Sequence, residues 1–146
     1  MKKFNLLLAV TLMVALFTGC QDNGKKYDFT KKQNVYYKGD GVTEDDAKKL
    51  ANYLSEIGYF GGDKELSVQI TKDKATKDTM NVKFVVDKSK VTEKVENAFK
   101  LIGGYIAQKV FSSSPVNLSF IDEHFKEVKN FGFVSPADEI QATQRQ

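Results

Sequence analysis

The sequence predicts a single α+β domain that follows an export signal. Two stretches carry apolar residues at the spacing of an amphipathic helix, and several shorter stretches alternate apolar and polar residues as strands do. The two kinds of stretch alternate along the 146 residues. A hydrophobic content of 41%, with 11 Phe and 6 Tyr, is sufficient to form a core.

The domain is expected to begin with a short strand at residues 34–38, which ends at the turn sequence Gly39-Asp40-Gly41. A helix follows, with Thr43 as its N-cap and acidic residues in its first turn. Gly58 is placed to end this helix in the left-handed conformation. The apolar face has helical spacing and consists of Ala47, Leu50, Ala51, Leu54 and Ile57.

Two alternating runs follow at residues 66–71 and 80–86, and the polar connection between them predicts an antiparallel hairpin. A second helix is expected over residues 91–111. We interpret its Gly103-Gly104 pair as a place where the helix packs closely against the sheet or the first helix. The alternative is that the pair forms a contact site for a partner. Strands at 116–120 and 125–131 complete the domain.

The order β-α-β-β-α-β with one extra C-terminal strand is typical of the ferredoxin-like plait. In that fold two right-handed β-α-β units interleave, which gives an antiparallel sheet with both helices on one face. The single domain is expected to span residues 34–134. Residues 135–146 are expected to form a polar tail.

Residues 1–19 have the pattern of an export signal. Two lysines are followed by an apolar stretch over residues 6–17, which fits a secretory signal and is too short to span a membrane. The segment after Cys20 is polar and lacks hydrophobic periodicity. We therefore expect residues 20–33 to hold the single cysteine of the chain, Cys20, and a flexible tether.

The end of this signal, Leu16-Phe17-Thr18-Gly19-Cys20, resembles the lipobox of bacterial lipoproteins. The resemblance implies that diacylglycerol is attached to the sulfur of Cys20, that the chain is cut before this residue, and that the new amino terminus is acylated, for example with palmitate. Several fatty chains on one residue anchor a protein stably, whereas one chain binds marginally. We expect a protein anchored to the cell membrane or outer membrane, with its domain outside the cytoplasm. Gln21 is not the Asp that favours inner-membrane retention in enterobacterial lipoproteins, so the outer membrane is favoured where two membranes exist.

The folded part is similar to a small uncharacterised α+β module of bacterial lipoproteins and other membrane-tethered proteins. This similarity implies no catalytic residue. It rests on fold-determining residues, namely Val35-Tyr36-Tyr37, Val42-Thr43, Ala47, Leu50, Leu54, Gly58-Tyr59-Phe60 and Phe84-Val85-Val86.

Charge and face composition argue against nucleic-acid binding. Without the signal the chain has 20 basic and 19 acidic side chains, so no strong field attracts phosphate. The expected open face of the sheet also lacks base-stacking aromatic residues, apart from Tyr36. It would show Ser67, Gln69, Thr71, Asn81, Lys83, Asn117 and Ser119.

No residue pattern indicates catalysis, a metal or a cofactor. The chain has one Cys and one His, and His124 lies in an expected charged turn, where we interpret it as solvated. The acidic group Asp40, Glu44, Asp45 and Asp46 lacks the spacing of a calcium loop and compensates the helix dipole. The tyrosines are interpreted as rim-of-core residues: Tyr36, Tyr37, Tyr53, Tyr59 and Tyr105.

The sequence therefore favours a non-enzymatic binding or interaction module of the cell envelope. Its expected partners are the membrane, through the lipid on Cys20, and another envelope protein; no small-molecule ligand can be inferred. One alternative is an envelope hydrolase or modifying enzyme that uses paired carboxylates. Another is a structural subunit that assembles through the exposed strand near residues 125–131.

Overall fold

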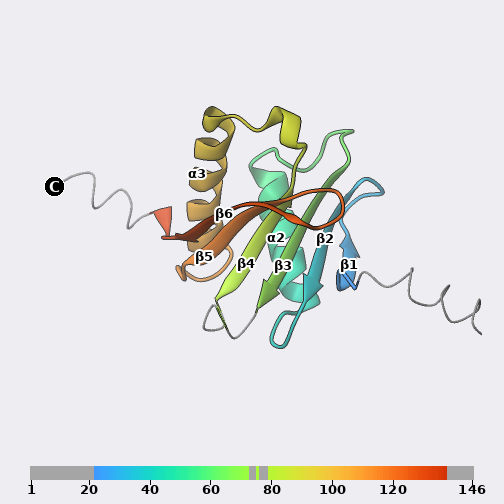
Figure 1. Ribbon diagram of the computed structural model, residues 1–146. Coiled ribbons are helices and arrows are strands. Elements are labelled where there is room, and N and C mark those ends of the chain that lie inside the picture. Colours follow the sequence, from blue (N-terminus) through green and yellow to red (C-terminus); the bar gives the residue numbers. More distant parts are fainter. Residues whose placement is uncertain (1–21, 73–74, 76–78, 138–146) are drawn as a thin grey trace, which may run out of the picture.

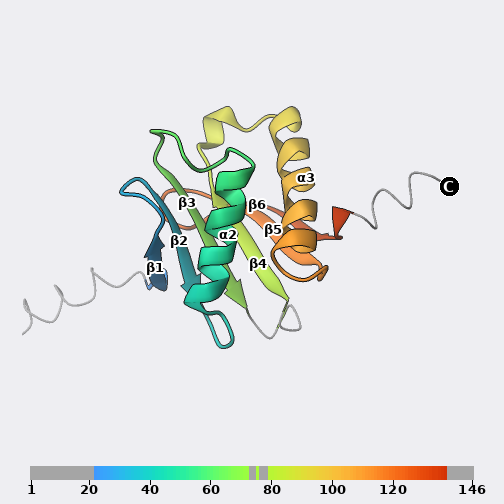
Figure 2. The same cartoon turned by 180° about the vertical axis from the view of Figure 1, so that it is seen from behind.

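The computed structural model describes residues 22–72, 75 and 79–137. They form an α+β fold in which two helices lie on one face of a six-stranded mixed sheet (Figure 1, Figure 2). Helix α2 (Glu44–Glu56) joins the second strand to the third, and α3 (Glu93–Lys109), after the short 3-10 helix η2 (Lys88–Lys90), joins the fourth to the fifth. The strands follow chain order across the sheet: β1 (Lys25–Asp28), β2 (Gln33–Lys38), β3 (Leu66–Lys72), β4 (Met80–Val85), β5 (Val116–Ile121) and β6 (Glu127–Val134).

The predicted α+β class, both helices and the extra C-terminal strand are confirmed. The residues predicted to cap and end the first helix also behave as expected. The amide of Asp46 donates to the hydroxyl of Thr43, and the amide of Thr43 donates to the Asp46 carboxylate, which makes a capping box. Gly58 has φ +79°, the left-handed conformation that ends a helix.

The strand order corrects the predicted ferredoxin-like plait. A plait interleaves its two β-α-β units, whereas here β2 pairs directly with β3 and β4 pairs directly with β5, both in parallel. Because β3 and β4 are antiparallel and both helices cover one face, the two crossovers must have opposite hands. The β2–α2–β3 crossover is the left-handed one (Figure 2). The plait was inferred from the rule that about 98% of such crossovers are right-handed, and this unit departs from that rule.

Gln33 supplies the contacts that place β3 beside β2. Its side chain is fully buried, accepts a hydrogen bond from the amide of Gly61 at 2.8 Å and donates to the carbonyls of Gly62 at 2.9 Å and Lys64 at 3.3 Å. The amide of Leu66 also donates to the carbonyl of Lys32. These bonds hold the α2–β3 connection against the start of β2, so β3 enters the sheet next to β2 and no strand is inserted between them.

Part of the segment predicted to be a tether, residues 20–33, is folded. Residues 25–28 form β1, which pairs antiparallel with β2. The Phe29 ring stacks on Phe60 with centroids 5.7 Å apart, and Phe60 is buried. The prediction failed here because an edge strand needs few apolar residues and this one carries lysines. The predicted polar tail also starts too early, because Ala137 is buried; residues 138–146 lie outside the described part.

The core is one cluster between the sheet and the helices. Gly103 lets α3 approach β5 closely, since a Cβ at this position would lie 3.2 Å from a methyl of Leu118. This bears out the structural interpretation of the glycine pair at Gly103. The largest fully buried apolar side chains are Phe84, Phe120, Leu50, Leu54, Ile70, Ile106, Leu118, Ile121, Val35, Val68 and Val82.

Candidate functional site

The face of the sheet opposite the helices is crossed by the β5–β6 hairpin. Figure 1 shows this hairpin passing in front of β4 and β3 toward β2. At its turn the Phe125 ring meets the edge of Tyr36 in β2, with centroids 4.9 Å apart. Phe125 has φ +62°, a conformation that is rare for a bulky residue. The contact with Tyr36 and a hydrogen bond from the Phe125 amide to the carbonyl of Asp122 hold this strained residue in place.

Asp122 builds the turn of the hairpin. Its Oδ1 accepts hydrogen bonds from the amides of His124 at 2.9 Å and Lys126 at 3.0 Å. The backbone of Asp122 also accepts from Phe125 and donates to Lys126, both at 2.9 Å. Asp commonly stabilises a turn in this way, because its short side chain lets the carboxylate accept hydrogen bonds from nearby backbone amides.

A cleft of about 890 Å³ opens between this turn, the start of β3 and the segment that follows β4. Apolar side chains from β3 and from the end of β4 contribute to its surface, and charged side chains of both signs supply the rest. Neither sign dominates, so the cleft fits a ligand that carries both. The lining residues are Lys64, Glu65, Leu66, Val85, Val86, Asp87, Lys88, Lys90, Asp122 and Glu123.

Two of the cleft carboxylates are held in their charged form. Hydrogen bonds from the backbone of Lys126 lower the pKa of Asp122 most, with a smaller contribution from Lys88, whose ammonium is 3.9 Å away. The hydroxyl and amide of Ser89 lower the pKa of Asp87. A carboxyl that acts as a general acid needs the opposite shift, a raised pKa. Asp87 and Asp122 are therefore suited to binding positive charge and to holding the loops.

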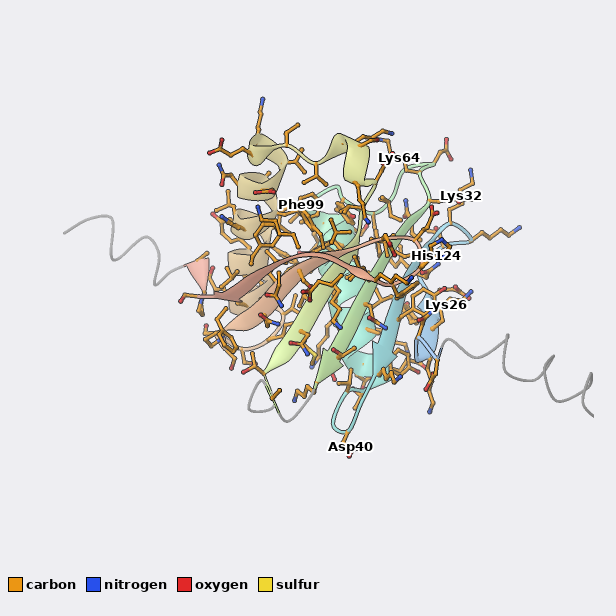
Figure 3. The ribbon with its side chains drawn as sticks, in the orientation of Figure 1. Lys26, Lys32, Asp40, Lys64, Phe99 and His124 are labelled. Carbon is orange, nitrogen blue, oxygen red and sulfur yellow. The ribbon has the colours of Figure 1, made fainter. Side chains whose placement is uncertain are left out.

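His124 lies where the sequence predicted, in an exposed charged turn. Its Nε2 is 3.5 Å from a carboxylate oxygen of Glu123, and its side chain is 69% exposed. His124 is not among the residues that line the cleft, although both of its neighbours on the amino side are. Figure 3 shows it on the open-face side of the molecule, toward Lys26 and Lys32.

The acidic residues near the start of α2 and the partly buried Tyr59 stabilise the fold. The acidic residues of α2 form its first turn, and the described part of the chain holds no group of three or more acidic, His or Cys side chains placed to bind a metal. Tyr59 packs in the core against Phe84 and Phe99, and burial raises the pKa of its hydroxyl. Cys20, the one predicted lipidation site, lies outside the described residues.

The open face of the sheet carries polar side chains, as predicted, and several of them form hydrogen-bonded ladders. Ser67 donates to Asn34 at 2.9 Å. Asn117 donates to Asn81, which donates in turn to Thr71, each at 3.0 Å. These ladders join β2 to β3 and β3 to β5 across β4, so the polar face contributes to strand pairing.

The sequence did not predict the cleft. An Asp two residues before His124 indicates a turn, and the Asp87-Lys88-Ser89 sequence indicates another. Neither pattern shows that the two turns meet each other and residues 64–66, because these segments are brought together only by the strand order.

One comparison with known proteins gives a match. A family model described as a family N-terminal domain matches residues 28–132. This range includes both helices, strands β2 to β5, most of β6 and every residue that lines the cleft. No curated protein and no solved structure matches the chain significantly.

Proposed function

We propose that this chain, which belongs to the AF_1994_N family, is a lipoprotein of the cell envelope that is anchored through Cys20, and that its domain binds a partner and catalyses no reaction. The lipobox-like end of the signal supports the anchor. Asp22, two residues after Cys20, is held to β2 by Lys38, so the domain follows the anchor residue closely. We place the domain outside the cytoplasm, on the cell membrane or the outer membrane.

The cleft carries the proposal that the domain binds rather than catalyses. Its carboxylates Asp87 and Asp122 have lowered pKa values and are engaged in turns. An enzyme that uses paired carboxylates needs one of them protonated near neutral pH. The exposed His124 offers no buried, oriented base to replace it.

The chemistry of the cleft favours a peptide segment of an envelope protein as the ligand. The apolar residues Leu66, Val85 and Val86 can receive a hydrophobic side chain, and the lysines and carboxylates around them can pair with charges of both signs. The cleft volume of about 890 Å³ is within the range of ligand sites in proteins.

Metabolic labelling with a fatty-acid analogue tests the anchor. We expect label on the wild-type chain and none on Cys20→Ser, which should also keep its signal and run as a larger protein. Gly19→Ala is the matched control, because it keeps a small residue before Cys20 and should keep the label. Equal labelling of wild type and Cys20→Ser would contradict the anchor.

Site-directed photocross-linking in intact cells tests the cleft. A photoreactive residue at Lys88, which lines the cleft, should give a discrete adduct with an envelope protein. The same residue at Lys94, which is exposed on α3 and is not among the residues that line the cleft, is the control and should give none. Equal yields at the two positions, or turnover of an envelope substrate by the purified protein, would contradict a binding role for the cleft.

A further inference from the structure

The chain reaches β1 from the open face of the sheet. The side chain of Gln69 in β3 donates a hydrogen bond to the carbonyl of Asn23 at 3.0 Å. The ammonium of Lys38 in β2 donates to the carbonyl of Asp22 at 2.8 Å and lies 3.4 Å from its carboxylate. We call Lys38 and Gln69, together with the residues 22–24 that they hold, the clasp.

Both holding residues of the clasp belong to the open face. Gln69 alternates with the core residues Val68 and Ile70, so its side chain points away from the helices. Lys38 likewise alternates with Tyr37, which packs against the core. The chain therefore leaves the domain on the side opposite the helices.

Gly24 makes the bend of the clasp possible. It has φ +91°, and its amide donates to the Asp22 carboxylate at 3.0 Å. A Cβ at this position would lie 2.4 Å from the carbonyl oxygen of Tyr37 and 2.8 Å from the Cβ of Lys38. These neighbours are backbone or close to it and cannot move aside, so glycine is required for the chain to turn here.

The clasp leaves little free chain before the proposed anchor. Only Gln21 separates Cys20 from Asp22. Consecutive Cα atoms are 3.8 Å apart, so the Cα atom of Cys20 lies within about 8 Å of the Cα atom of Asp22. A lipid on Cys20 would hold the open face against the bilayer, whereas a long tether would have left the orientation free.

We propose that the open face of the sheet is the membrane-contacting surface of the domain, with the helices directed away from the bilayer. This inference rests on the proposed lipid anchor at Cys20.

The side chains of the open face suit a headgroup layer. Phe133, which pairs in register with Asn117 on this face, is 63% exposed, and Tyr36 and Phe125 lie together across the sheet. Tyr is enriched at membrane interfaces, and Phe is among the residues that enter this layer from the apolar face of interfacial helices. Lys83, at the centre of the face, has no ion-pair partner among residues 22–72, 75 and 79–137, so it can pair with a lipid phosphate.

Fluorescence quenching in vesicles tests this orientation. The lipidated full-length protein is reconstituted in phosphatidylcholine–phosphatidylglycerol vesicles that contain a lipid with a spin-labelled headgroup. A single cysteine is introduced at Lys83, on the open face, or at Asn52, exposed on α2, and labelled with a fluorophore. The introduced thiol is the only reactive one, because the sulfur of Cys20 carries the lipid.

We expect quenching to be several-fold stronger for Lys83→Cys than for Asn52→Cys. Equal quenching, or stronger quenching at position 52, would overturn the orientation. Mass spectrometry of Cys20 separates the two proposals. If Cys20 is acylated but quenching at position 83 is not the stronger, the orientation alone is overturned. If Cys20 is not acylated, the anchor is overturned and the orientation with it.

Variants of the clasp test whether the clasp orients the domain on the bilayer. Gly24→Ala should reduce the difference in quenching between positions 83 and 52, since the bend at residue 24 cannot form. Gly62→Ala is the control, because a Cβ there meets no atom within 4 Å, and it should keep the difference in quenching. Lys38→Ala combined with Gln69→Ala removes the clasp bonds without a backbone clash and should act like Gly24→Ala. An unchanged difference in quenching in this double variant would overturn the clasp as the orienting device.

Discussion

At the scale of single residues, two polar side chains organise the connections of this domain. Gln33 bonds to three backbone groups of residues 61–64, and Asp122 bonds to two amides of the hairpin turn. A group held away from water and left without a partner costs about 1–3 kcal/mol, so the part-buried bonds of Gln33 strongly favour one path of the chain, whereas the exposed bonds of Asp122 contribute less. Each side chain contacts only a few backbone groups, but these contacts help to set the strand order and the shape of the cleft.

Replacing Gln33 by alanine should destabilise the fold by about 2–3 kcal/mol, because the partners of a fully buried amide lose their hydrogen bonds. Urea unfolding followed by circular dichroism measures this loss. Asn52→Ala, at an exposed position on α2, is the control and should stay within about 0.5 kcal/mol of wild type. A loss for Gln33→Ala as small as for the control would contradict the role assigned to Gln33.

Asp122 should make the stability depend on pH in the acid range. Its pKa is lower in the folded chain than its ordinary value of 3.8, so its charge stabilises the fold above that value. The contribution is lost as the pH falls through the lowered pKa. Unfolding free energies measured from pH 5 down to pH 2 should fall less steeply for Asp122→Asn than for wild type. Asp63→Asn, which leaves Asp122 intact, is the control, and an identical pH dependence in all three chains would refute the assignment.

At the scale of elements, the ends of helices and the edge of the sheet are both specified locally. The last strand, β6, has no second neighbour among the strands that the structure describes, but it shifts register twice along β5, and Gly132 has φ +74°. Such irregularities discourage pairing with another chain, so β6 is poorly suited to the assembly role considered from the sequence. Lys129 of this strand instead pairs with Glu96 of α3 at 2.8 Å and fixes the strand to the helix.

Replacing Gly58 by alanine should destabilise the fold by about 1–2 kcal/mol. A Cβ at Gly58 meets no atom within 4 Å, so the cost comes from the left-handed conformation alone. Gly62→Ala is the matched control, since its surroundings are equally open and no positive φ is present there. Thermal or urea unfolding should separate the two variants by at least about 1 kcal/mol. Equal stabilities would mean that the end of α2 can relax to a right-handed conformation.

At the scale of the whole molecule, the described residues form one sheet with a single core on its helical face. The first strand is part of this unit, because Tyr27 and Phe29 pack against the core. Helices α2 and α3 lie over opposite halves of the sheet, and the hairpin covers part of the other face (Figure 1). The domain therefore extends from the clasp to Ala137 and leaves no independent tether inside it.

A chain that begins at Asp22 should have the same unfolding midpoint in urea as one that begins at Cys20. A chain that begins at Thr30 should be less stable by at least about 2 kcal/mol, since it loses β1 and the contact of Phe29 with Phe60. Equal stability of all three chains would show that residues 22–29 are a tether after all. The comparison uses the unlipidated chains in solution, so it does not depend on the proposed anchor.

The sequence by itself determined the elements of the fold and the places where they begin and end. Apolar spacing located both helices, and Thr43 and Gly58 marked the ends of α2. A β-rich run before a turn located β2, and alternation located the four strands that follow it. These features depend on interactions between residues close in the chain, which leave a periodic pattern in the sequence. The strand β1 lacked that pattern because it lies at an edge and carries lysines.

Only the tertiary structure decided the strand order, the hand of the first crossover, the cleft and the clasp. A β-α-β-β-α-β pattern is compatible with interleaved and with sequential strands, since both orders bury the same apolar faces. The choice is made by bonds between distant segments, such as Gln33 with residues 61–64 and Gln69 with Asn23. Each of these is a single polar contact across many residues, and a contact of this kind leaves no periodic signal along the chain.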